Sequence, residues 1–154
     1  MSEDNYSLSV GCVVIREEQV LLVRHTYGSA KGQLLIPGGY CKPEELPEET
    51  ARREVLEETQ VAANPIGLLA LRCRQNSWYA VLLMQYEAGE ATSDKQENNE
   101  AIFMDLTEAI EREDVTQMTK VAIELYLEKK DKLWLQDVEY QKVSTKPCAM
   151  FDGR

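Results

Sequence analysis

The feature that most constrains the fold is a helix-forming segment, residues 47–59, which lies between stretches with the composition of β-strands. It consists largely of Glu, Ala, Arg and Leu, which favour helices, and it begins with a proline, which a first helical turn accepts. Two glutamates follow this proline and suit a helix N-terminus. Asn64 and Pro65 then break the pattern. The sequence therefore predicts one well-defined helix between strands.

Strand-like segments occur on both sides of this helix. They are rich in Val, Ile, Leu and aromatic residues and are bounded by polar turns. The first two should form a hairpin, and the next ends at Pro37-Gly38-Gly39, where a proline and two glycines should stop regular pairing. An acidic loop over residues 89–99 precedes the last strand. The candidate strands are residues 8–15, 20–25, 34–36, 66–73, 79–86 and 101–104.

A second helix is expected over residues 115–127, where apolar side chains recur at helical spacing and Asp114 is available as the cap. The tail, residues 129–154, mixes charged and apolar residues and receives no assignment. A chain of 154 residues is long enough to bury one core without disulfides or a structural metal. We therefore expect residues 1–154 to form a single domain.

The charge balance limits the partners. The chain carries 27 acidic and 17 basic side chains, a net charge of -10, so a long nucleic acid and an anionic membrane surface should be repelled. A small polyphosphate stays open if divalent cations bind between it and the protein. Residues 1–6 are polar and acidic, so we expect no secretory signal, and no apolar run approaches the roughly 20 residues that span a bilayer. The four scattered cysteines indicate free thiols in a reducing cytoplasm, where we expect the protein.

The chemistry is concentrated in the predicted helix. Glu54, Glu57 and Glu58 stand at i, i+3 and i+4, so they should share one helical face, where like charges destabilise a helix by a few tenths of a kcal/mol. A hard cation bound by these carboxylates would offset their mutual repulsion. Magnesium suits this role, because it prefers oxygen ligands and keeps positions open for water and phosphates. Arg53 can fix a carboxylate through its planar fork. The glutamates alone would also suit a solvated acidic face.

The wider spacing decides between these two interpretations. The segment reads GGYCKPEELPEETARREVLEETQV from Gly38 to Val61. Five residues separate Gly39 from Glu45, and seven separate Glu45 from the run Arg53-Glu54-Val55-Leu56-Glu57-Glu58-Thr59. This pattern closely resembles the signature of the Nudix hydrolase family. One position departs: Gln60 replaces the usual glycine, so the helix either ends in a left-handed residue or ends differently.

The resemblance implies both a fold and a site. The fold would be an α/β/α sandwich around a mixed β-sheet. Glu54, Glu57 and Glu58 would bind Mg²⁺, with Mn²⁺ as the other candidate, and Gly38 would offer its main-chain carbonyl. Arg53 and Glu45 would orient these ligands, and the catalytic base would come from the three glutamates.

Further candidates lie outside the signature. Family members commonly recruit another acid from a downstream loop, for which Glu100 is preferred over Glu97, although a solvated loop charge is an equal alternative. His25 is expected to be a packed or edge residue. Three aromatic residues are candidates for stacking on a base, although aromatics near strands usually serve the core or its rim: Tyr27, Trp78 and Tyr79.

The predicted function is hydrolysis of the pyrophosphate bond in a nucleoside diphosphate linked to another moiety. Dinucleotides, ADP-ribose-like compounds and nucleoside triphosphates all remain open as small-molecule substrates, and a homodimer is possible. The main alternative is a catalytically silent Nudix-like domain that senses a nucleotide or nucleotide sugar. A calcium-stabilised structural helix ranks lower, because the alternating Asp/Asn ligands of an EF-hand are absent.

Overall fold

The computed structural model describes residues 6–130, together with the backbone of two short strands near the C-terminus. The N-terminal half contains β1 (Ser7–Arg16), β2 (Gln19–His25), β3 (Leu34–Leu35), β4 (Gly38–Tyr40), α1 (Pro47–Thr59) and β5 (Ala62–Arg74). The remainder contains β6 (Ser77–Ala88), β7 (Asn98–Asp105), α2 (Leu106–Glu111), α3 (Gln117–Lys129), β8 (Leu135–Asp137) and β9 (Phe151–Gly153). The helix expected at residues 47–59 is confirmed to the residue.

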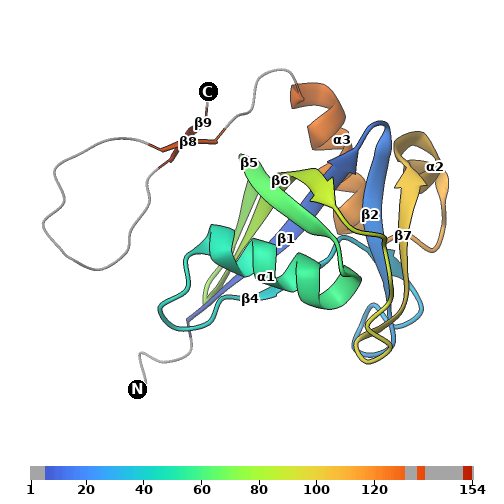
Figure 1. The fold of residues 1–154 in the computed structure, drawn as a ribbon. Coiled ribbons are helices and arrows are strands. Elements are labelled where there is room, and N and C mark those ends of the chain that lie inside the picture. The colour runs from blue at the N-terminus through green and yellow to red at the C-terminus, as the bar shows by residue number, and fades with distance from the viewer. Residues whose placement is uncertain (1–5, 131–134, 138–150, 154) are drawn as a thin grey trace, which may run out of the picture.

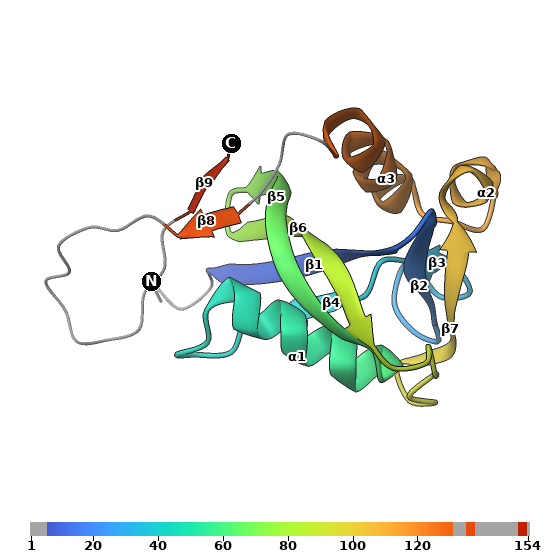
Figure 2. The same ribbon diagram turned by 45° about the horizontal axis from the view of Figure 1, so that its top comes forward.

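One mixed sheet forms the centre of the fold. Its strands run in the order β3-β2-β1-β6-β5, while β4 pairs with β1 and β7 pairs with β2. β1 and β6 are parallel, and the other pairs are antiparallel. The helix α1 covers one face of the sheet, and α2 and α3 cover the other (Figure 1, Figure 2). The predicted α/β/α sandwich is therefore confirmed, and β8 and β9 form a separate antiparallel pair.

Two apolar layers hold the helices to the sheet. Successive side chains of a strand point to opposite faces, so Val13 and Val14 on β1 enter different layers. Val14 packs in the layer that contains Val55 of α1, whereas Val13 packs in the layer that contains Ile123 of α3. All four side chains are completely buried. The backbone of α1, which carries the signature, is thus fixed against the sheet.

One helix prediction needs correction, and one short helix was not predicted. The last long helix begins at Gln117, and its N-cap is Thr116, whose hydroxyl accepts a hydrogen bond from the Thr119 main chain. Asp114 instead accepts hydrogen bonds from Arg24 and Arg112, because two guanidinium groups lie within reach. The short helix α2 was not expected. It starts where the Asp105 side chain accepts two main-chain N–H groups.

Two strand predictions were also wrong. Gly38 and Gly39 do not stop pairing, since Gly39 lies opposite Val10 in β4. A Cβ at Gly38 would meet the Val10 carbonyl oxygen, so the missing side chain is what permits this close approach. β5 runs through Asn64 and Pro65, where the register shifts. β5 lies at the end of the sheet, and an edge strand tolerates a proline.

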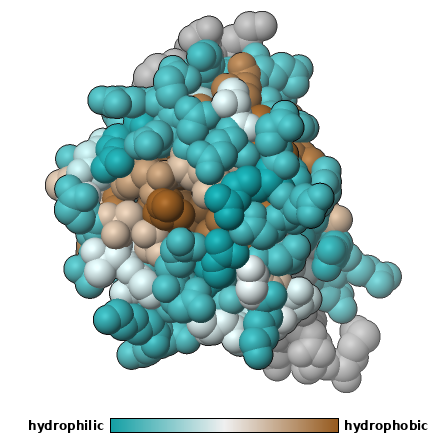
Figure 3. Space-filling view, turned by 90° about the vertical axis from the view of Figure 1, so that its right-hand side faces the viewer, coloured by the Kyte–Doolittle hydropathy of each residue, from teal (hydrophilic) through white to brown (hydrophobic). Residues whose placement is uncertain are grey.

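On the face that Figure 3 shows, hydrophilic side chains dominate the surface and surround a small apolar patch. Among the described helices, none is long and apolar enough to cross a membrane. Cys12, Cys41 and Cys73 are free thiols, as expected, whereas Cys148 lies outside the described residues.

Candidate active site

The two ends of α1 show how the sequence builds this helix. At its start, the Leu46 main-chain N–H donates to the Glu49 carboxylate at 3.0 Å. At its end, Gln60 has φ 60° and ψ 14°, and its N–H donates to the Leu56 carbonyl at 2.9 Å. The first of the two expected endings, a left-handed glutamine, is therefore confirmed. The departure from the signature changes a side chain and leaves the helix end intact.

Arg53 binds three carboxylates of the acidic cluster. Its Nε and Nη2 donate to the two carboxylate oxygens of Glu45 at 2.7 and 2.9 Å, which is a bidentate pair. Its Nη1 donates to Glu54 at 2.9 Å and to Glu57 at 3.2 Å. The hydrogen bonds from Arg53 lower the pKa of Glu45 to about 2, although burial opposes the shift. One guanidinium therefore fixes three carboxylates.

Glu58 is the buried acid of the cluster. It is only 3% exposed, and its Oε1 accepts a hydrogen bond from the Gly38 main-chain N–H at 3.4 Å. Its Oε2 is buried and receives no hydrogen bond from a donor group among the residues that the structure describes. Burial first, and then the charge of Glu54, raises the pKa of Glu58 to about 9. An orphaned carboxylate oxygen of this kind is costly without a partner of opposite charge.

Glu54 lies between Arg53 and the glycine turn. Its side chain is 13% exposed, and burial raises its pKa even though Arg53 opposes the shift. A Cβ at Gly39 would overlap its Oε1, so the carboxylate occupies space that only glycine leaves free. The turn and the helix face are thus complementary in shape.

Glu57 differs from its two neighbours, because its side chain is 55% exposed and points to Arg53. The expected convergence of three glutamates is therefore incomplete. Within the part of the chain that is described, no three acidic, Cys or His side chains lie close enough together to hold a metal ion. Magnesium, however, is usually bound through one or two carboxylates plus substrate phosphates. The unpartnered Oε2 of Glu58 beside Glu54 fits a hard divalent cation.

The two downstream acids, Glu97 and Glu100, have different surroundings. Glu100 accepts a hydrogen bond from Arg24 at 2.9 Å, and Arg24 also binds Asp114 at 3.1 Å. Glu97, in contrast, is close enough for its charge to raise the pKa of both Glu54 and Glu58. The electrostatic influence on Glu54 and Glu58 makes Glu97 a candidate beside Glu100, whose carboxylate is held by Arg24.

Comparison with known proteins fixes the family. The family model for the NUDIX domain matches residues 5–126. The chain belongs to the Nudix family of hydrolases. Members of this family generally use divalent metal ions and act on small nucleotide-derived substrates.

Individual Nudix proteins agree with this assignment. A Nudix hydrolase structure from Nitrosomonas europaea superposes with a TM-score of 0.75 at 21% identity, covering 84% of this chain and 74% of that one. A MutT protein structure from Methanosarcina mazei gives 0.68 at 22% identity, covering 86% and 100%. "Putative nudix hydrolase 1" of Caenorhabditis elegans is 30% identical over 80 residues, which are 49% of this chain and 22% of that relative. The chain thus spans about a fifth of that relative's length.

Asn98 is a functional candidate that the sequence did not reveal in this Nudix domain. It is completely buried, and its Nδ2 donates to the Glu58 main-chain carbonyl at 3.0 Å. The Asp94 carboxylate accepts three successive main-chain N–H groups, from residues 96–98. This turn, with Asn98, fixes the loop that carries Glu97. The only local signal was Asp94, a residue type that favours such turns.

The aromatic candidates occupy different environments. Trp78 packs edge-on against Tyr6, with ring centroids 5.8 Å apart. Tyr79 is largely buried beneath the guanidinium of Arg72, 4.9 Å from its ring, so it is unavailable for stacking on a base. Tyr27 is 51% exposed and stacks on His25. Among the three, only Tyr27 combines exposure with a place near the acids.

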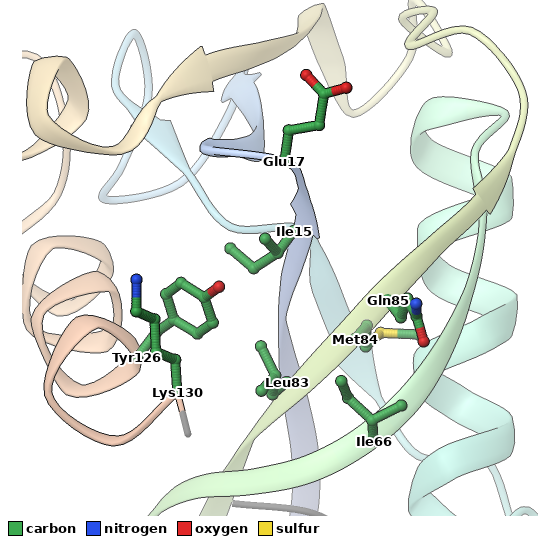
Figure 4. A pocket seen from close by; sticks show the side chains of 8 residues that line it. All are labelled: Ile15, Glu17, Ile66, Leu83, Met84, Gln85, Tyr126 and Lys130. Carbon is green, nitrogen blue, oxygen red and sulfur yellow. The ribbon is translucent and has the colours of Figure 1, made fainter. Parts of the chain in front are cut away.

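A groove on the opposite side of the sheet is chemically different. It lies between β6 and α3, away from α1, and Figure 4 shows Ile66, Leu83 and Tyr126 directed into it. Among the described residues of its lining, Glu17 is the single carboxylate. These residues offer no cluster of acids for a metal–diphosphate complex.

Proposed function

We propose that this Nudix protein is a Mg²⁺-dependent hydrolase that cleaves the pyrophosphate bond of a nucleoside diphosphate derivative. The observation that carries the proposal is the buried, unpartnered Oε2 of Glu58 beside Glu54, at the glycine turn of the signature. This arrangement costs free energy unless a cation compensates it.

Each residue has a proposed role. Glu54 and Glu58 hold the cation, Mg²⁺ or alternatively Mn²⁺, and Glu57 turns from Arg53 toward it, with the Gly38 carbonyl and Glu97 as further ligands. When bound, it neutralises phosphate charge and lowers the pKa of a water. The Glu45–Arg53 pair, with bonds of 2.7 and 2.9 Å, positions Glu54 and Glu57.

The reaction needs a proton acceptor and an oriented water. Water attacks one phosphorus atom, the bond from phosphorus to the bridging oxygen breaks, and a nucleotide and a phosphate or phosphate ester leave. A carboxylate accepts the proton of the water. The three glutamates supply this base, and Arg53 restricts two of them to fixed positions.

Two structural relatives support a nucleoside diphosphate substrate. An ADP-ribose pyrophosphatase from Streptococcus suis superposes with a TM-score of 0.65 at 19% identity. A UDP-X diphosphatase superposes with 0.67 at 19% identity. Both names describe nucleoside diphosphates linked to another moiety, which is the substrate class that we propose here.

The test is a substrate screen with matched variants. Purified protein is incubated with Mg²⁺ and a panel of dinucleotides, ADP-ribose-like compounds and nucleoside triphosphates, and phosphate is measured after coupling to a phosphatase. Glu57→Gln and Glu58→Gln should lose orders of magnitude in turnover. Glu124→Gln, an exposed glutamate on α3, is the control and should match the wild type. Wild-type binding without turnover in Mg²⁺ or Mn²⁺ would instead identify a silent sensor.

A further inference from the structure

Two aromatic side chains stack at the end of β2. The rings of His25 and Tyr27 are nearly parallel, with centroids 5.0 Å apart and an interplanar angle of 15°. A shift in register between Arg24 and His25, opposite β7, redirects this strand end. Such irregularities often aim a side chain beside an active site. Tyr27 remains 51% exposed, so it retains accessible surface for a ligand.

The backbone that carries the pair is anchored on both sides. Thr26 donates its main-chain N–H to the Glu97 carbonyl at 3.0 Å and its hydroxyl to the Gln96 carbonyl at 3.0 Å. On the other side, Gly32 N–H donates to the His25 carbonyl at 2.9 Å. The loop after β2 and the loop before β7 therefore lie together (Figure 1). Such anchoring lowers the entropy cost of binding a ligand on this surface.

The pair also lies within electrostatic reach of the acidic site. Burial raises the pKa of the Tyr27 phenol, and the charges of Glu97, Glu58 and Glu54 raise it further. Burial lowers the pKa of His25, so its imidazole is neutral at physiological pH. The rings thus flank Thr26, whose main-chain N–H binds the carbonyl of Glu97, one of the acids. An uncharged aromatic ligand group is accepted beside such acids, whereas an unaccompanied phosphate is repelled.

We infer that the stacked pair of His25 and Tyr27 is a platform for the nucleobase of the substrate. The inference rests on the proposed function, because the diphosphate must lie at the glutamates for the base to reach the platform. Aromatic rings bind every base through its π-face. The platform therefore selects nucleoside diphosphate derivatives over diphosphates that lack a base.

The experiment measures binding by calorimetry with the full chain, Mg²⁺ and the α,β-methylene analogue of ADP, whose bridge resists hydrolysis. Tyr27→Ala should weaken binding about tenfold to a hundredfold, the usual effect of losing one base-stacking ring. Tyr27→Phe keeps the ring and should bind like the wild type. Trp78→Ala is the matched control, since Trp78 is 41% exposed and packs against Tyr6. It should also bind like the wild type.

The two proposals fail in different ways. If Tyr27→Ala binds the analogue as the wild type does, or if the wild type does not bind it, the platform is wrong. Equal weakening by Trp78→Ala would also overturn it. Hydrolysis of the nucleotide panel, lost in Glu57→Gln, would leave the proposed function standing in each case. Conversely, Tyr27-dependent binding without any hydrolysis would support the platform and refute the hydrolase.

Discussion

The side-chain amide of Asn98 donates a hydrogen bond to the main-chain carbonyl of Glu58 across 40 positions of sequence, at 3.0 Å. The last carbonyls of a helix lack partners within the helix, so this bond satisfies one of them. The neighbouring Thr59 carbonyl accepts the Thr92 main-chain N–H at 2.8 Å. The loop that carries Glu97 is therefore attached to the end of α1. This attachment positions a downstream acid beside the signature.

Asn98→Ala should weaken this attachment. It leaves the buried Glu58 carbonyl without its donor, which costs about 1–3 kcal/mol in unfolding free energy. The freed loop should also raise the Mg²⁺ concentration needed for half-maximal activity. Chemical denaturation and a Mg²⁺ titration measure the two effects. Asn99→Ala, next to it but exposed, is the control, and equal behaviour of both variants would contradict the role of Asn98.

Gly38 and Gly39 should respond differently to the same substitution. A Cβ at Gly39 meets the carboxylate of Glu54, the far end of a flexible side chain, which can move away. Gly39→Ala should therefore keep the stability of the wild type and lose activity. At Gly38 the Cβ meets the Val10 main-chain oxygen, so Gly38→Ala should destabilise the fold by about 1–3 kcal/mol.

Thermal melts and turnover assays on the two alanine variants separate these effects. Gly39→Ala should melt with the wild type while its requirement for Mg²⁺ increases. Full activity in Gly39→Ala would show that the position of Glu54 is unimportant. An unchanged melting temperature in Gly38→Ala would show that β4 can move away from β1.

The sequence was sufficient to predict the structural features that depend on residues close together in the chain. The bounds of the helix at residues 47–59 follow from its proline, its composition and the residues that cap it. The signature identified Arg53 and Glu45 as positioning residues. Their bidentate pair needs only the helix and the turn that precedes it. These features involve residues close in sequence. Propensity and spacing are sufficient for them.

The remaining features depend on contacts between distant residues. Glu97 and Glu100 are three positions apart, and their surroundings depend on the Asp94 turn and on the pairing of β7 with β2. Arg24, 76 positions from Glu100, binds that carboxylate, which no local pattern can reveal. The pairing of Gly39 with Val10 also joins residues that are far apart in the sequence. Tertiary contacts, rather than propensity, decide these positions.

The buried carboxyl of Glu58 should make the stability of the metal-free protein depend on pH. Its pKa rises from 4.5 to about 9 on folding, mainly because burial disfavours its charge. Between these values the folded state binds the proton that the unfolded state releases. The unfolding free energy should therefore fall as pH increases through this window, by about 1.4 kcal/mol for each pH unit between the two pKa values. Denaturation in EDTA at several pH values measures the slope.

Glu58→Gln is the matched variant for this measurement. It cannot ionise, yet it keeps an acceptor for the Gly38 N–H. Its stability in EDTA should exceed that of the wild type at pH 8 and should vary less with pH. Added Mg²⁺ should stabilise the wild type more than this variant, because a cation favours the charged carboxylate. The same pH slope in both proteins would contradict the assignment of the buried proton to Glu58.

Gln60→Gly tests the single departure from the family signature. Gln60 has φ 60°, a conformation in which a side chain costs roughly 1 kcal/mol and glycine costs little. Glycine should therefore stabilise the protein by about that amount, although its greater freedom in the unfolded state reduces the gain. Gln60→Ala keeps the Cβ and should not stabilise. Activity should barely change in either variant, because the Gln60 main-chain N–H still donates to the Leu56 carbonyl. Thermal melts with and without Mg²⁺ decide, and a lower melting temperature for Gln60→Gly in both conditions would show that the left-handed glutamine is not strained.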